Sequence, residues 1–201
     1  MKAAQTRRIL ILVLSVACLA GVGCGSLRKT MPDRSAMEQL LISTAADKAV
    51  EKMAAPEMIG KTIYLDTTNL DATDEEYVTE RFRMLVIESG GRLTQDPGKA
   101  EMKIEIASGA LSMDSRDWLL GLPRIPIPLP MVQETLRLPE VAIFKTDTLK
   151  GRAKLVMLGL DPETGAEALE PRTTYGVSTN TYIWVLLFGP FQWTDLPEEV
   201  L

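Results

Sequence analysis

Two segments of the chain carry apolar side chains at the spacing of an α-helix. Ser35 and Glu38 form a capping box, which predicts a helix from there to about Met53, ended by Pro56. Thr73–Glu76 reads as a second capping box, and the helix it opens is expected to close at Gly90-Gly91. The inward residues are expected to be Met37, Leu40, Leu41, Ala45, Ala49, Val50 and Met53 in the first helix, and Tyr77, Val78, Phe82, Leu85 and Val86 in the second.

The rest of the chain alternates between apolar and polar residues, which is typical of β-strands. A turn at Asp161–Gly165 joins two of these segments, because proline presets one backbone angle and glycine accepts a positive φ. The predicted strands are residues 61–66, 100–113, 141–146, 151–160, 166–178 and 180–188. The order of helix, strand, helix, strand and then a run of strands predicts an α+β fold, a two-layer sandwich with two main helices packed on one face of a mixed, largely antiparallel sheet.

The N-terminal segment has the pattern of an export signal. Residues 1–8 carry three basic residues and no acid, and Ile9–Ala20 is an uninterrupted apolar run that ends in small residues before Cys24. The Val22-Gly23-Cys24 ending resembles the lipobox of bacterial lipoproteins. That resemblance implies cleavage before Cys24, acylation of its thiol and amine, and, with Gly25 and Ser26 following, anchoring to the outer membrane on the periplasmic side.

These features predict three parts of the chain: a signal peptide at 1–23, a tether at 24–34 and a single periplasmic domain at 35–201. A retained transmembrane anchor over Ile9–Leu27 is the alternative, since 19 uncharged residues approach the length of a membrane span. The small residues at its end, Gly-Val-Gly-Cys-Gly-Ser, are weakly apolar and favour the lipoprotein.

Composition removes several classes of chemistry. The 201 residues contain no histidine and two cysteines, so a histidine-based catalytic triad or metal site is excluded within the chain. The formal charge is −5, and it becomes −8 when the three basic residues of 1–23 leave, which argues against a nucleic-acid partner. We expect no catalytic residues, no metal and no cofactor, and we do not expect an enzyme.

Two acidic features leave an alternative open. Five acids cluster around the end of the first strand and the start of the second helix: Asp66, Asp71, Asp74, Glu75 and Glu76. Calcium and magnesium bind several carboxylate oxygens at once, but helix capping and a solvated turn explain these acids better. Carboxylates distant in sequence can also converge in a cleft. An envelope enzyme or solute-binding lipoprotein with a carboxylate-lined cleft is therefore the second hypothesis.

The segment Trp118–Met131 is apolar and rich in proline, so its backbone is expected to be extended. One interpretation is a cover laid over the core, and the other is a loop that docks on a partner or on the membrane surface. The candidate partner-binding residues are Trp118, Leu122, Ile125, Ile127 and Leu129.

A second apolar run, Thr181–Trp193, has the residue types of a buried central strand, which we expect over Tyr182–Phe188. The alternative is an interfacial anchor with Trp184, Phe191 and Trp193 at the level of the lipid headgroups.

The strings SAMEQLLISTAADKA, LPRIPIPLP and YGVS…GPF resemble an uncharacterised bacterial lipoprotein family, a domain of unknown function, over Ser35–Phe191. The segments KTIYLD, DEEYVTERFRMLVIESGGRL and AEMKIEIASGAL, with the D-P-x-T-G turn, resemble more weakly the periplasmic domains of the CsgG and TolB amino-terminal type. These resemblances imply a non-catalytic lipoprotein that binds an envelope partner or assembles with its own copies.

Lipidation at Cys24 has a direct test. Cells that express the chain are labelled with radioactive palmitate, and we expect Cys24→Ala to abolish incorporation, because the thiol is the acylated atom. Label that persists in Cys24→Ala would contradict the assignment.

Overall fold

The computed structural model describes residues 34–72, 74–127, 136–137, 139–186 and 188–198, which belong to one compact unit, Arg34–Leu201. Its helices are α2 (Ala36–Val50) and α3 (Glu75–Glu88), with short 3-10 turns η1 (Glu51–Met53), η2 (Pro56–Met58) and η3 (Pro97–Lys99). Its strands are β1 (Thr62–Asn69), β2 (Arg92–Leu93), β3 (Met102–Leu122), β4 (Pro126–Ile127), β5 (Leu136–Arg137), β6 (Val141–Leu160), β7 (Glu167–Val185) and β8 (Phe188–Thr194).

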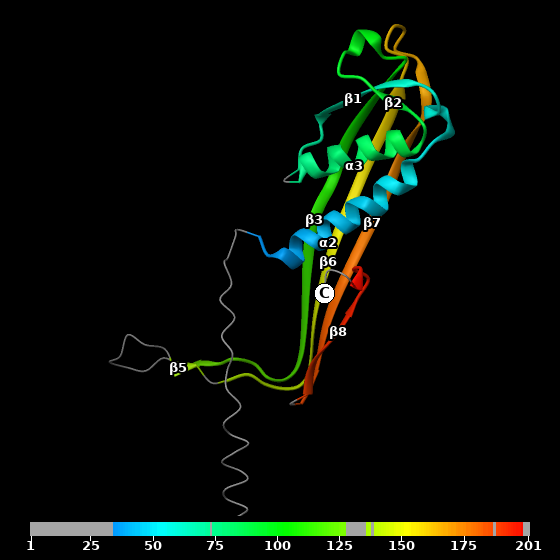
Figure 1. The fold of residues 1–201 in the computed structure, drawn as a ribbon. Coiled ribbons are helices and arrows are strands. Elements are labelled where there is room, and N and C mark those ends of the chain that lie inside the picture. Colours follow the sequence, from blue (N-terminus) through cyan, green and yellow to red (C-terminus); the bar gives the residue numbers. More distant parts are fainter. Residues whose placement is uncertain (1–33, 73, 128–135, 138, 187, 199–201) are drawn as a thin grey trace, which may run out of the picture. The chain divides into compact units, whose positions relative to one another are not determined.

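Six strands form one mixed sheet in the order β2-β1-β3-β6-β7-β8, and β4 pairs with β5 separately (Figure 1). Strand β1 runs parallel to β2 and β3, whereas the pairs β3–β6, β6–β7 and β7–β8 are antiparallel. The predicted α+β class with a mixed, mostly antiparallel sheet and two helices is confirmed.

The first capping box forms only in part, and the second is displaced by one residue. The Ser35 hydroxyl accepts a 3.1 Å bond from the Glu38 amide, but the Glu38 carboxylate accepts from Arg34 Nε at 3.2 Å instead of returning to Ser35. The N-cap of α3 is Asp74 rather than Thr73, and its carboxylate accepts two 2.9 Å bonds from Arg34. An ion pair to the start of α2 thus replaces the expected side-chain cap.

The strands are longer than the sequence pattern indicates. Strand β6 is continuous through the two segments predicted at 141–146 and 151–160, and β7 joins those predicted at 166–178 and 180–188. Strand β3 continues to Leu122, into the segment expected to be a proline-rich loop. Threonine, glycine and charged residues interrupt the apolar alternation at the centre of each strand, so the sequence pattern predicts shorter strands.

The buried core cluster draws its residues from both helices and from β1, β3, β6 and β7. The two helices meet at Asp47, which forms an ion pair with Arg81 Nε at 3.0 Å and accepts a 3.0 Å hydrogen bond from the Tyr77 hydroxyl. Tyr77 is therefore 42% exposed rather than inward. Partial burial of its hydroxyl, together with the negative charge of Asp47, raises the pKa of Tyr77 to about 12. Fully buried core side chains include Leu41, Val50, Met53, Met58, Ile63, Phe82, Ile104, Leu155 and Met157.

Two glycines let the backbone of α2 rest directly on the sheet. A Cβ at Gly151 of β6 would overlap the carbonyl oxygen of Leu41, and one at Gly176 of β7 would overlap that of Ala45. Alanines on the facing side of the helix, including Ala45 and Ala49, are fully buried, so small residues on both surfaces produce the close approach.

The helices cover only one end of the long strands (Figure 1). Residues Met102, Ile104 and Ile106 of β3 are buried, but from Ser112 to Leu122 none is, and β6 shows the same change on the Val141 side of Gly151. We call this region the distal half: 112–122 of β3, 141–150 of β6, 179–185 of β7, and β8. In the distal half, burial comes chiefly from neighbouring strands.

Gly176→Ala tests the close approach of α2. The added methyl group has no free space against the Ala45 backbone, so we expect the free energy of unfolding to fall by about 2–3 kcal/mol in urea denaturation. Gly98→Ala is the matched control, because its nearest atom is 3.4 Å away and the site is exposed; a change within about 0.5 kcal/mol is expected. Equal effects of the two substitutions would contradict the account of helix seating.

Candidate docking face

The distal half carries one strongly apolar face. Since α2 rests on Gly151, odd-numbered residues of β6 face the helices there and even-numbered ones face away. Residues opposite each other in an antiparallel pair share a face. The register then gives three rows across β3, β6, β7 and β8 on the face away from the helices: Leu120, Phe144, Val185 and Phe188; Trp118, Thr146, Ile183 and Phe191; Arg116, Thr148, Thr181 and Trp193.

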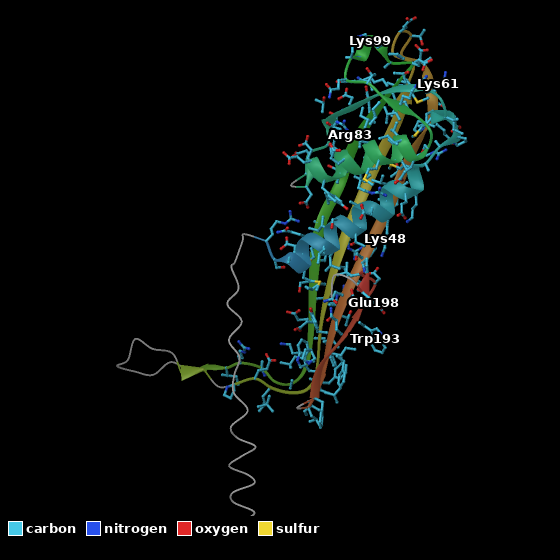
Figure 2. The ribbon with its side chains drawn as sticks, viewed as in Figure 1. Lys48, Lys61, Arg83, Lys99, Trp193 and Glu198 are labelled. Atoms are coloured by element: carbon cyan, nitrogen blue, oxygen red, sulfur yellow. The ribbon has the colours of Figure 1, made fainter. Side chains whose placement is uncertain are left out.

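We call the apolar members of these rows the docking face: Trp118, Leu120, Phe144, Ile183, Val185, Phe188, Phe191 and Trp193. The exposed fraction reaches 74% for Trp193 and 71% for Phe188, and it exceeds half for Phe191, Trp118 and Leu120. Four aromatic rings exposed to this degree present on the order of 500 Å² of apolar surface. Contiguous patches of that size usually mark an interaction site. Trp193 is visible toward the distal end, far from Lys61 and Lys99 at the other end of the sheet (Figure 2).

A band of basic side chains borders the docking face. We call Arg116, Lys150, Arg152 and Lys154 the basic band; they occupy the same side of β3 and β6 as the docking face, in the adjoining rows. Asp114 is the single acid among the β3 and β6 residues of these rows, and it pairs with Arg152 at 2.7 Å. The other three have no ion-pair partner among the described residues, although Lys154 lies over the ring of Tyr175 at 5.8 Å. A shallow depression is lined by Asp114, Ser115, Arg116, Thr148, Lys150 and Arg152.

The opposite side of the distal half combines an ion-pair network with apolar side chains. Lys145 Nζ lies 3.1 Å from Glu140 and 3.8 Å from Asp147, and it sits over the Trp184 ring at 5.5 Å. Burial raises the pKa of Asp147, and one of its carboxylate oxygens has no hydrogen-bond partner within the described structure. Val141 and Ile143 of β6 lie on this opposite side and are 55% and 53% exposed, so it mixes paired charges with apolar residues, whereas Arg116 is the one charged residue in the three rows of the docking face.

The structure places three of the predicted partner-binding residues at the distal end. Trp118, Leu122 and Ile125 are exposed by 54%, 62% and 45%, so none belongs to the described core. Ile127 lies in β4, in the part where side chains are not described, and Leu129 and Cys24 lie outside the described residues.

The buried central strand expected over Tyr182–Phe188 is wrong. The end of β7 has left the helix-covered region, Val185 is 42% exposed, and Phe188 begins the edge strand β8. The sequence reasoning also missed Phe144, Ile183 and the basic band. The alternation Thr146, Thr148, Lys150, Arg152, Lys154 along β6 was the available signal, because every second residue of a strand shares a face.

Two of the five acids in the acidic turn, Asp66 and Asp74, are held by internal bonds. Asp66 accepts a 2.8 Å bond from Lys103, and this bond together with those from Thr68 lowers the pKa of Asp66 to about 2. Asp74 is held by Arg34. No group of three His, Cys, Asp or Glu side chains suited to a metal occurs among the residues that the structure describes.

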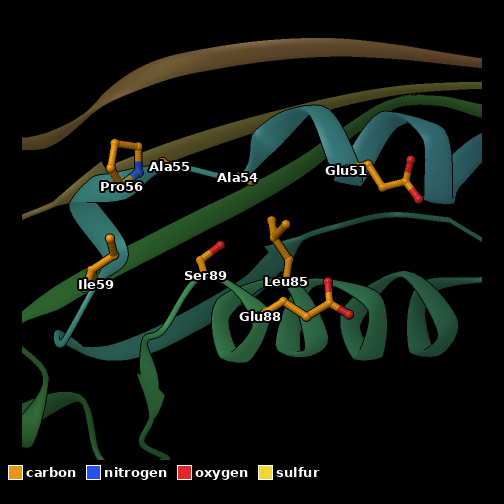
Figure 3. A pocket seen from close by; sticks show the side chains of 8 residues that line it. All are labelled: Glu51, Ala54, Ala55, Pro56, Ile59, Leu85, Glu88 and Ser89. Atoms are coloured by element: carbon orange, nitrogen blue, oxygen red, sulfur yellow. The ribbon is translucent and has the colours of Figure 1, made fainter.

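A cleft at the other end of the domain contains two carboxylates. Glu51 follows α2 and Glu88 ends α3, and they lie on opposite sides of the cleft with Leu85 between them (Figure 3). Both acids are exposed, and the remaining lining is Ala54, Ala55, Pro56, Ile59 and Ser89. This cleft offers carboxylates for weak polar contacts but no further ionisable group.

Residues 18–199 match the model of a protein family described as a family of unknown function (DUF6655). No curated protein matches the chain significantly. In the part of the chain that the structure describes, no helix is both long enough and apolar enough to cross a membrane.

Because the docking face is exposed, its side chains are expected to contribute little to the free energy of unfolding. The double variant Phe188→Ser/Trp193→Ser should lower the free energy of unfolding by only about 1 kcal/mol, because these side chains lose little packing. Leu155→Ala, fully buried, should cost about 2–5 kcal/mol in the same urea denaturation. A loss in the double variant as large as that in Leu155→Ala would mean that the face belongs to the core.

Proposed function

We propose that this chain, which belongs to the family of unknown function DUF6655, is a non-catalytic, lipid-anchored envelope lipoprotein. Its domain docks through the docking face. The domain then acts by binding at the outer membrane, on the periplasmic side, rather than by transforming a substrate. In this proposal Cys24 carries the lipid, and residues 24–34 tether the domain.

One observation carries the proposal: the docking face gathers four aromatic side chains, each more than half exposed, in three rows that hold a single charged residue. A water-facing sheet normally has polar residues on its exposed side. Leaving five large apolar side chains more than half exposed is unfavourable for a free domain. An external surface that covers them would recover that free energy, which is what a docking function requires.

The remaining parts of the domain suit a holder for this face. We take the helices and the proximal sheet as a two-layer sandwich that fixes β3, β6 and β7 at one end. Strand pairing over the full 20-residue length of β6 then keeps the distal rows in register. The docking face is thus preorganised, which lowers the entropy lost on binding.

A carboxylate-lined cleft, as in an envelope enzyme or solute-binding lipoprotein, is the second candidate. It is favoured only by Glu51 and Glu88 in the cleft of Figure 3. A catalytic pair of carboxylates needs contrasting environments that set one as acid and the other as base. Both of these side chains are exposed to water, so the cleft supports this function less well than the distal face supports docking.

Site-specific photocrosslinking in intact cells tests the docking function. A photoreactive phenylalanine analogue replaces Trp118 on the docking face, 54% exposed, or Met84 on α3, 48% exposed, as a matched control. We expect adducts with an envelope component, protein or lipid, from position 118 and at least several-fold less from position 84. No adduct at position 118, or equal yields at both positions, would contradict docking through this face.

A further inference from the structure

We infer that the docking face binds the surface of a membrane containing anionic phospholipids, with the aromatic rows at the headgroup boundary and the basic band on the phosphates. The inference rests on the proposed function, because it names what that face binds. It is argued from the adjacency, on one side of the sheet, of exposed aromatic rings and basic side chains, three of which have no ion-pair partner in the described part of the chain.

The apolar rows have the composition that membrane interfaces select. Tryptophan and other aromatic side chains are enriched at the level of the lipid headgroups, where a flat ring is partly apolar and partly wet. Trp118, Phe188, Phe191 and Trp193 are each more than half exposed on the same side of four neighbouring strands. Trp118 also packs edge-on against Phe144, with ring centroids 5.5 Å apart, so the rings are held in position rather than hanging free.

The basic band has the charge and spacing for lipid phosphates. Thr146 lies opposite Trp118, and Lys150 follows four residues later on β6, so the two levels are separated by about 14 Å along the strand. Arg116 lies between these levels. The described residues of this surface hold four basic side chains and one acid, in a chain whose formal charge is −5. This local reversal of charge matches an anionic surface, and each basic residue near such a surface is worth roughly a fivefold change in affinity.

The direction of α2 and the length of the segment between Cys24 and Arg34 fit the same placement. Lys48 of α2 and Lys52 of the following turn η1 donate to the carbonyls of Val177 and Tyr175, so α2 runs antiparallel to β7 and begins toward the distal half. The ten residues that separate Cys24 from Arg34 span at most about 35 Å when fully extended. From Gly151 to Phe144, β6 covers only about 24 Å. A lipid on Cys24 therefore leaves the docking face free to reach the same membrane.

A protein partner explains the basic band less directly. A second copy of this chain that paired through the same face would bring a surface with the same surplus of positive charge, and the described residues of that face supply only Asp114 to balance it. An anionic lipid surface supplies negative charge over the whole area at once.

Quenching by brominated lipids tests the inference with the chain's own tryptophans. The sequence has three, and the structure places all of them in the distal half: Trp118 and Trp193 on the docking face and Trp184 on the opposite side. The lipid-anchored full chain is reconstituted into vesicles of equimolar phosphatidylcholine and phosphatidylglycerol with brominated acyl chains. We expect Trp118→Phe/Trp184→Phe, which leaves Trp193, to be quenched at least threefold more than Trp118→Phe/Trp193→Phe, which leaves Trp184.

Charge variants separate lipid recognition from simple proximity to the anchor. In the Trp193 reporter, the added substitutions Arg116→Gln, Lys150→Gln and Lys154→Gln should reduce quenching at least threefold, as should vesicles of phosphatidylcholine alone. Circular dichroism and urea denaturation check that this variant folds as its parent does. Unchanged quenching on removal of the charges would overturn the role of the basic band.

The remaining outcomes distinguish the two proposals. If Trp193 is not quenched but position 118 crosslinks to a protein, whether a second copy or another chain, the membrane inference is wrong and docking stands. If Trp193 is not quenched and position 118 gives no adduct, both fail. Equal quenching of Trp184 and Trp193 would also overturn the inference, because the opposite side would then lie equally deep in lipid.

Discussion

The contact between the backbone of α2 and two glycines of the sheet determines how the rest of the domain is arranged. At Gly151 and Gly176 the helix backbone occupies the space of the missing side chains, so α2 has one position on β6 and β7. The helix crosses Gly151 at Leu41 and runs from there away from the distal half, and α3 is joined to it by the contacts to Asp47. The position of these glycines therefore decides which end of the long strands is covered and which is left to solvent.

The two ends of the same strands consequently obey different rules. In the proximal part, β1, β3, β6 and β7 contribute buried side chains to the core shared with the helices, and these are apolar except for Thr174 and Ser178 of β7. Beyond the first turn of α2 no described helix covers the distal half, yet the side away from the helices still carries rows of aromatic residues, while Lys145, Glu140 and Asp147 pair on the other side. Strand pairing preserves the register there, but it leaves the apolar surface without a covering layer. Function is expected where a sequence departs in this way from the usual apolar-inside pattern.

The sequence predicted the local structure better than the extent of the strands. The start of α2 at Ser35, the turn at Asp161–Gly165 and the mixed α+β order all follow from short-range rules, and the structure agrees with them. The Tyr77 and Thr73 predictions were wrong because Asp47 and Arg34, distant in sequence, provide the partners. The site was found only in part: Trp118, Leu122 and Ile125 stood out as apolar. Phe188 was predicted in a buried strand because the apolar composition of 182–188 does not reveal that β7 has left the helix-covered region before Phe188 begins β8. Only the register across four strands brings Phe144, Ile183 and the basic band together with Trp118.

The accessibility of the docking face in its native surroundings tests the account most directly. Phe188→Cys and Met84→Cys each introduce one thiol into the domain, which has no cysteine of its own. In isolated envelopes, a membrane-impermeant maleimide should label position 84 rapidly and position 188 at least several-fold more slowly, although Phe188 is 71% exposed and Met84 is 48% exposed in the isolated structure. Labelling of position 188 as fast as position 84 would show that the distal face stays open to water, and it would contradict the account.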